Sequence, residues 1–151
     1  MSPIVCQIPI NASKEAIWQV VTDWENAAER ISGINSIEVL NKPADGIVGF
    51  KWIETRTMFG REATETMWVT EAVENDYYNV AAESHGTKYL TQISIKEENG
   101  VNQLVMSFNG TPVSTGAKIM SFLMGWMMKG TLRKAVNKDL EDIKAAVEAK
   151  A

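Results

Sequence analysis

The residues best suited to chemistry are an arginine and two glutamates on two neighbouring stretches of alternating apolar and polar character. Alternation places Glu54 and Arg56 on one face of a strand predicted over residues 47–58, and Glu65 on one face of the next predicted strand. If these faces point inward, Arg56 forms a buried, charge-assisted pair with Glu54 or Glu65 that can orient a carbonyl or carboxylate, or act as acid and base. If they point outward, the same side chains form cross-strand charge pairs on the hydrated surface, and the sequence favours this second interpretation.

Tyr89 is a further candidate, because a phenol can both stack on a ligand and donate a hydrogen bond. Arg56, Glu65 and Tyr89 are therefore the candidate catalytic residues, although a strand tyrosine more commonly serves to pack a half-buried face. The only histidine, His85, precedes Gly86 in a predicted turn, so no metal-ligand spacing is present. The sequence also has no nucleophile triad, Gly-rich phosphate loop or dinucleotide fingerprint, and we expect neither a metal nor a cofactor.

Residues 114–151 are predicted to form one long helix whose two halves need different surroundings. In the second half, a single apolar stripe with helical spacing faces a core, and charged residues face water. The stripe consists of Leu132, Val136, Leu140, Ile143 and Val147, and the residues left for water are Lys134, Lys138, Glu141, Asp142 and Lys144. The first half is apolar around nearly its whole circumference and rich in methionine, which adapts to irregular space.

We therefore predict that the first half of this helix forms one wall of an apolar pocket, although each of its residues is also compatible with ordinary core packing. On the helix side, the predicted lining is Ile119, Phe122, Met124, Met127 and Met128. On the sheet side, the predicted lining is Trp52, Met67 and Tyr89.

The remaining elements follow from periodicity and from turn residues. A strand at residues 4–10 precedes two short helices at 14–24 and 27–31. Six strands follow, separated by turn sequences, at residues 36–40, 47–58, 61–74, 77–84, 87–97 and 101–109. This order predicts an α+β fold in which a curved antiparallel sheet of seven strands wraps around the long C-terminal helix.

Composition narrows the function. A chain of 151 residues and 16.7 kDa suits one domain, predicted over residues 1–151. The net charge of -4 and the lack of a basic run argue against nucleic acid as a partner. The apolar block at 119–128 is too short for a membrane span, and the N-terminal sequence has no secretion signal. We expect a cytoplasmic monomer or weak homodimer.

The chain resembles the START-like, helix-grip superfamily (SRPBCC), in particular its polyketide cyclase/dehydrase and lipid-transport branch. The resemblance covers the whole chain and rests on patterns: residues 12–18 leading to Asp23-Trp24, Gly33-Ile34, Val48-Gly49, Gly60-Arg61-Glu62 with Glu65, and the helix end at 140–148. The chain departs from many relatives at residues 27–32, where those relatives have an aromatic residue and a proline. The resemblance implies a cavity between sheet and helix that holds an apolar or aromatic small molecule.

Three functions remain open. The first is binding or transport of an apolar small molecule, such as a lipid, isoprenoid or aromatic polyketide-like compound. The second is an enzyme of the polyketide cyclase/dehydratase type that acts on such a ligand through Arg56, Glu65 or Tyr89. The third is a partner-binding protein in which the methionine-rich block is an exposed docking face. Fold alone does not choose among them.

Overall fold

The computed structural model describes the backbone of residues 3–58, 60–84, 87–112 and 115–150. Its description of side chains leaves out residues 58, 61, 83–84, 87, 111–112, 115–129 and 131 as well.

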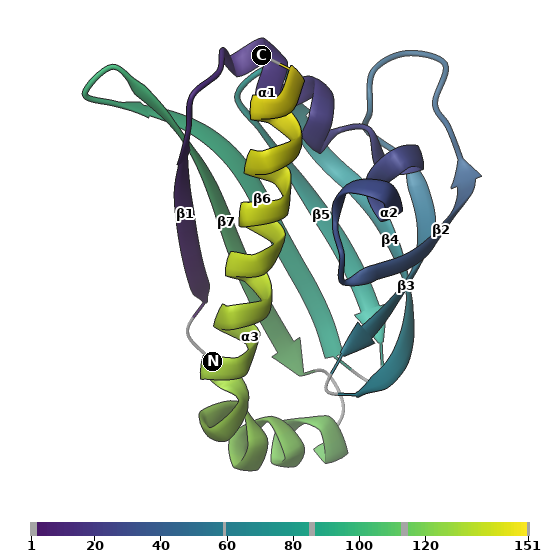
Figure 1. The fold of residues 1–151 in the computed structure, drawn as a ribbon. Helices are drawn as coiled ribbons and strands as arrows, with labels where there is room; N and C mark the ends of the chain where they lie inside the picture. The colour runs from purple at the N-terminus through teal and green to yellow at the C-terminus, as the bar shows by residue number, and fades with distance from the viewer. Residues whose placement is uncertain (1–2, 59, 85–86, 113–114, 151) are drawn as a thin grey trace.

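Seven antiparallel strands form one curved sheet, and a long helix lies across its concave face (Figure 1). The strand order is β1-β7-β6-β5-β4-β3-β2, so β2 to β7 form a continuous meander and β1 joins it beside β7. The elements are β1 (Ile4–Ile10), α1 (Lys14–Val21), the 3-10 turn η1 (Trp24–Asn26), α2 (Ala27–Arg30), β2 (Ile34–Asn41), β3 (Lys51–Met58), β4 (Arg61–Val73), β5 (Tyr77–Ser84), β6 (Thr87–Glu98), β7 (Val101–Pro112) and α3 (Thr115–Lys150). The predicted fold class is confirmed.

The turns between strands use the residues that tolerate a positive φ. Asn99 and Gly100 have φ of 55° and 80°, as a two-residue hairpin between β6 and β7 requires. Asn75 has φ of 63° in the turn between β4 and β5. The strand predicted from residue 47 begins only at Lys51, because Gly49 (φ 92°) turns the chain so that its N–H donates to the carbonyl of Val69.

Helix α1 begins and ends through hydroxyl side chains. Ser13 accepts a hydrogen bond from the N–H of Ala16 at 3.1 Å, which satisfies one free donor of the first turn. Thr22 donates both its backbone N–H and its Oγ1 hydroxyl to the carbonyl of Trp18. The helix therefore ends at Val21, and Trp24, which was predicted to belong to it, lies in η1.

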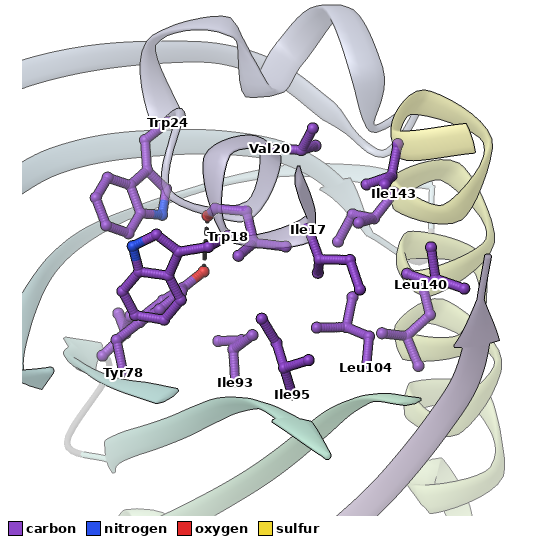
Figure 2. Close-up of a cluster of buried hydrophobic side chains, with 14 of the residues drawn as sticks. Ile17, Trp18, Val20, Trp24, Tyr78, Ile93, Ile95, Leu104, Leu140 and Ile143 are labelled. Atoms are coloured by element: carbon purple, nitrogen blue, oxygen red, sulfur yellow. Dashed lines mark hydrogen bonds between the residues drawn. The ribbon is translucent and has the colours of Figure 1, made fainter. Parts of the chain in front are cut away.

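The core fills the space between α1, the sheet and the second half of α3 (Figure 2). Ile17, Leu104 and Leu140 come from these three elements and are each at most 1% exposed. The Tyr78 hydroxyl donates to the carbonyl of Val21 at 2.8 Å, which ties β5 to α1. The apolar stripe predicted on the terminal helix is thus confirmed as a core stripe, and α3 packs chiefly against β1 and β7.

Asp142 departs from the predicted water-facing set. Its carboxylate accepts hydrogen bonds from the backbone N–H and the hydroxyl of Ser32, both at 2.9 Å, and pairs with Lys138. Its side chain is only 14% exposed. Asp142 therefore holds the start of β2 against α3.

Candidate functional site

Side chains on the concave face of the sheet differ in how far they are exposed to solvent. Cross-strand partners share a face, so the register of the strands assigns the inward residues of each strand. Inward residues of the core cluster are nearly inaccessible, as Val69 (1%) and Ile95 (2%) illustrate. Five other inward residues, on β4, β6 and β7, are only half-buried, and we call them the half-buried patch: Met67, Tyr89, Thr91, Met106 and Phe108.

The half-buried patch is apolar and aromatic in character. Met67 and Tyr89 are both cross-strand partners of Ala82, and Thr91 is the partner of Phe108. The rings of Tyr89 and Phe108 stack with their centroids 5.5 Å apart and an interplanar angle of 21°. Such a surface suits flat or flexible apolar groups.

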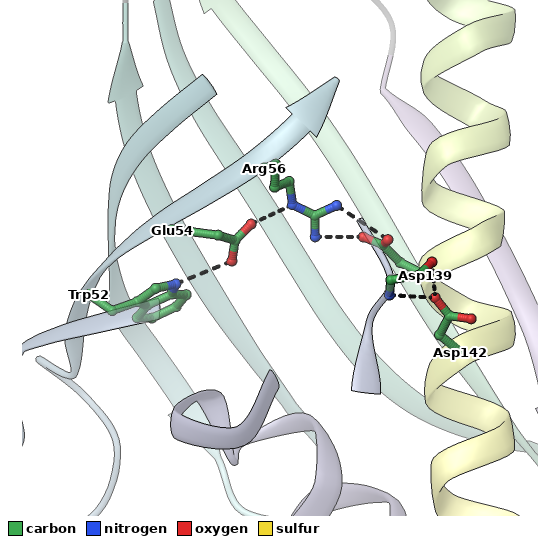
Figure 3. Close-up of polar contacts among 6 residues, drawn as sticks. Trp52, Glu54, Arg56, Asp139 and Asp142 are labelled. Carbon is green, nitrogen blue, oxygen red and sulfur yellow. Dashed lines mark hydrogen bonds and ion pairs between the residues drawn. The ribbon is translucent and has the colours of Figure 1, made fainter. Parts of the chain in front are cut away.

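A network of charged side chains joins β3 to α3 across the concave face (Figure 3). Arg56 donates from Nε to Glu54 at 2.5 Å, and from its two terminal nitrogens to Asp139 at 3.2 and 2.7 Å. Trp52 donates its indole N–H to the other oxygen of Glu54 at 3.3 Å. We call Glu54, Arg56 and Asp139 the ion triad.

The ion triad is largely removed from water and carries one surplus negative charge. The side chains of Arg56, Glu54 and Asp139 are 21%, 8% and 12% exposed. Burial alone would lower the pKa of Arg56, but Glu54 and Asp139 together raise it above its ordinary value. Burial raises the pKa of Asp139, and Arg56 only partly counteracts this, because one cation serves two carboxylates.

The surface interpretation favoured by the sequence is wrong for Glu54 and Arg56. Both side chains lie on the concave face and are bound within the ion triad. Glu65 is directly opposite Glu54 in the register of β3 and β4, shares its face and is half-buried. The inward alternative therefore describes this part of the sheet, with Asp139 as the partner that joins Arg56 to the helix.

The predicted ligand-binding residues fall into three groups. Met67 and Tyr89 belong to the half-buried patch. Trp52 is 2% exposed and lies in the core, stacked on Trp24 at a centroid distance of 4.9 Å. The side chains of the other five lie outside the described residues: Ile119, Phe122, Met124, Met127 and Met128.

Four residues of this region were not predicted: Thr91, Met106, Phe108 and Asp139. Asp139 comes three residues after Val136 and four before Ile143, so it lies on the apolar stripe of the helix. A carboxylate in such a stripe is a signal that a buried partner exists. Met106 and Phe108 alternate with Leu104 on β7, and that alternation was the signal for a shared inward face.

A separate shallow groove of about 310 Å³ lies between the end of α1 and the loop that precedes β3. Its apolar floor is made by Trp24 and Phe50, which are 7% and 6% exposed. Lys42 and Glu25 at its rim form an ion pair at 2.8 Å. Among the described side chains, no group of three or more His, Cys, Asp or Glu residues has a metal-binding arrangement. In the same part of the chain, no helix is both long and apolar enough to cross a membrane.

A curved seven-stranded antiparallel sheet around a long C-terminal helix, with short helices after the first strand, is the helix-grip arrangement of START-like proteins. A family model described as polyketide cyclase / dehydrase and lipid transport matches residues 4–148, and the chain belongs to this family. The search of curated proteins gave no match.

Solved structures share this fold at low sequence identity. The protein TTHA0849 from Thermus thermophilus is 13% identical, with a TM-score of 0.81 and 99% of each chain covered. The di-domain ARO/CYC protein StfQ from the steffimycin biosynthetic pathway is 9% identical, with a TM-score of 0.79; 98% of this chain covers 51% of that one. A START superfamily protein from Mycobacterium smegmatis is 16% identical, with a TM-score of 0.66, and the match covers 99% of this chain and 97% of that one.

Proposed function

We propose that this protein binds an apolar small molecule between the half-buried patch and the first half of α3. The observation that carries the proposal is the change in burial along one concave face. Inward residues of the core cluster are nearly inaccessible, whereas Met67, Tyr89, Met106 and Phe108 keep part of their surface accessible although they also point inward. Apolar surface of this kind gains about 25 cal/mol for each Å² that a ligand removes from water.

Family membership supports the same class of function. The family description joins polyketide cyclases and dehydrases with lipid transport, and all of these handle largely apolar compounds. The sequence of the first half of α3, apolar around most of its circumference, is consistent with a wall opposite the half-buried patch.

A matched pair of substitutions on the sheet tests the proposal. N-phenyl-1-naphthylamine, a neutral apolar dye, serves as the probe, and its fluorescence reports binding. Met67→Gln changes the concave face, and we expect it to weaken dye binding about tenfold, or about 1.4 kcal/mol. Leu90→Gln is the control, because Leu90 is 49% exposed and points to the convex face beside Tyr89. Equal effects of the two changes, or no dye binding by the unaltered protein, would contradict the proposal.

The second candidate is an enzyme of the cyclase/dehydratase type, and the ion triad is the observation that favours it. A carboxyl whose pKa is raised by burial, as that of Asp139 is, is better suited to give or take a proton near neutral pH. Mass spectrometry of compounds released from the native protein, followed by incubation with them, separates the two candidates. An unchanged compound supports a carrier, whereas conversion that Asp139→Asn abolishes in a folded variant supports an enzyme.

A further inference from the structure

The ion triad lies at the border of the half-buried patch. Along β3, Glu54 is the next inward residue after Trp52, whose cross-strand partner is Met67. Glu54 and Arg56 therefore follow the position of Met67 toward the C-terminal end of β3. A ligand that covers Met67 brings its adjacent atoms within reach of the triad.

The guanidinium group of Arg56 already uses its nitrogens in hydrogen bonds within the ion triad. Three nitrogens of Arg56 donate to Glu54 or Asp139, and the contact with Asp139 is bidentate, the strongest arrangement for this pair. An incoming carboxylate or phosphate would have to displace one of these groups and leave a buried carboxylate without its partner, which is strongly unfavourable. Arg56 is also the single cation among the described side chains on the concave face of the strands.

The carboxylates, in contrast, retain capacity to accept hydrogen bonds. Among the described residues, each oxygen of Glu54 and Asp139 accepts one hydrogen bond, and an ionised carboxylate offers about four lone-pair sites. The triad therefore favours a ligand group that donates a hydrogen bond or carries positive charge, and its surplus negative charge repels an anion.

On the basis of the proposed function, we propose that Glu54 and Asp139 determine ligand specificity by excluding anionic head groups, so that the preferred ligands are apolar molecules with a neutral hydroxyl or a cationic ammonium group. Free fatty acids and phosphorylated lipids are then poor ligands. The charge balance of the ion triad, rather than pocket size, makes this distinction.

Three probes with the same alkyl chain test this inference: decan-1-ol, decanoate and decyltrimethylammonium. Each is titrated at about pH 8, where a carboxylic acid is ionised, against protein loaded with N-phenyl-1-naphthylamine. We expect decan-1-ol and decyltrimethylammonium to displace the dye at concentrations about tenfold lower than decanoate. Decanoate that competes as well as decan-1-ol would overturn the inference and leave the proposed function intact. Failure of the dye itself to bind would instead contradict the proposed function.

Two variants assign the effect to the triad. Asp139→Asn and Glu54→Gln each remove the surplus charge, and we expect each to narrow the difference between decan-1-ol and decanoate by about threefold or more. Glu141→Gln removes the same charge from an exposed position on α3 and should leave the ratio unchanged. An equal change of the ratio in all three variants would show that overall charge, not the triad, selects the ligand.

Discussion

Arg56 on β3 and Asp139 on α3 are joined by two parallel hydrogen bonds, and this contact connects the helix to a strand other than β1 and β7, against which it chiefly packs. The helix packs apolar side chains against the core beside β1 and β7 and donates hydrogen bonds from Arg133 and Lys144 to carbonyls of β1, whereas its described contact with β3 is an ion pair. Substitutions in the core stripe and in the ion triad therefore test different contacts of α3.

Removal of the triad's cation should destabilise the protein strongly. Arg56→Met leaves Glu54 and Asp139 as uncompensated buried carboxylates, and breaking a buried pair in this way costs about 3–5 kcal/mol. The urea midpoint of unfolding measures the effect. Lys42→Met, which removes an ion pair at the surface, is the control and should leave the midpoint nearly unchanged. Similar midpoints for the two variants would mean that the triad is hydrated in solution.

The triad also predicts how stability depends on pH. Burial raises the pKa of Asp139 in the folded protein, where Arg56, Glu54 and Asp142 are the charged groups around it. The folded state thus binds this proton more tightly than the unfolded chain does, and the Asp139 contribution to stability falls as pH rises from the ordinary aspartate range through the raised pKa. When urea midpoints are compared from acidic to neutral pH, the Asp139→Asn variant should not show the fall in stability that Asp139 causes as pH rises.

Asp142→Asn should also change how the urea midpoint depends on pH, but in the direction opposite to that of Asp139→Asn. Burial alone would raise the pKa of Asp142, but hydrogen bonds from Ser32 and Lys138 lower it. Its contribution is present above the ordinary aspartate pKa and is lost as pH falls through the lowered one. Parallel profiles for the two variants would contradict the charge assignment of the triad.

Two apolar substitutions distinguish the core from the proposed binding surface. Leu140→Ala should destabilise by about 2–5 kcal/mol, because Leu140 is 1% exposed and its removal leaves a cavity. Met67→Ala should cost clearly less, since Met67 is half-buried and the space it leaves adds to an accessible region. Denaturant titration measures both, and equal losses would indicate that the half-buried patch is ordinary core.

Tyr78→Phe tests the polar tie between β5 and α1. The Tyr78 hydroxyl is buried and donates to the carbonyl of Val21, so its loss leaves that carbonyl without this donor and should cost about 1 kcal/mol. Tyr77→Phe is the matched control on the convex face, where the phenol donates to Glu71. The control should change thermal stability much less, and a larger loss from Tyr77→Phe would contradict this account.

Sequence patterns predicted the fold well because its signals are local. Alternation and turn residues such as Asn99-Gly100 fix each strand and hairpin within a few residues of the chain. The partner of Arg56 was not predictable in the same way, because alternation shows that Glu54 and Arg56 share a face but not which face is covered. Which face is covered depends on where Asp139 lies, and Asp139 is 83 positions away in the sequence. Tertiary packing of α3 brings Asp139 to β3.

The position of β1 beside β7 has a consequence for the order in which the protein assembles. The strands from β2 to β7 are joined by short loops, so each hairpin can form locally. Ile4 pairs with Phe108, so β1 can join the sheet only after β7 has been placed, and its pairing closes a very long loop. We expect the meander to be organised in the folding transition state and β1 to dock afterwards. Ile4→Val should then speed unfolding while leaving the folding rate nearly unchanged in stopped-flow measurements, and a slowed folding rate would place β1 in the nucleus instead. During synthesis on the ribosome, the first strand of this sheet to emerge is thus among the last to pair with its neighbour.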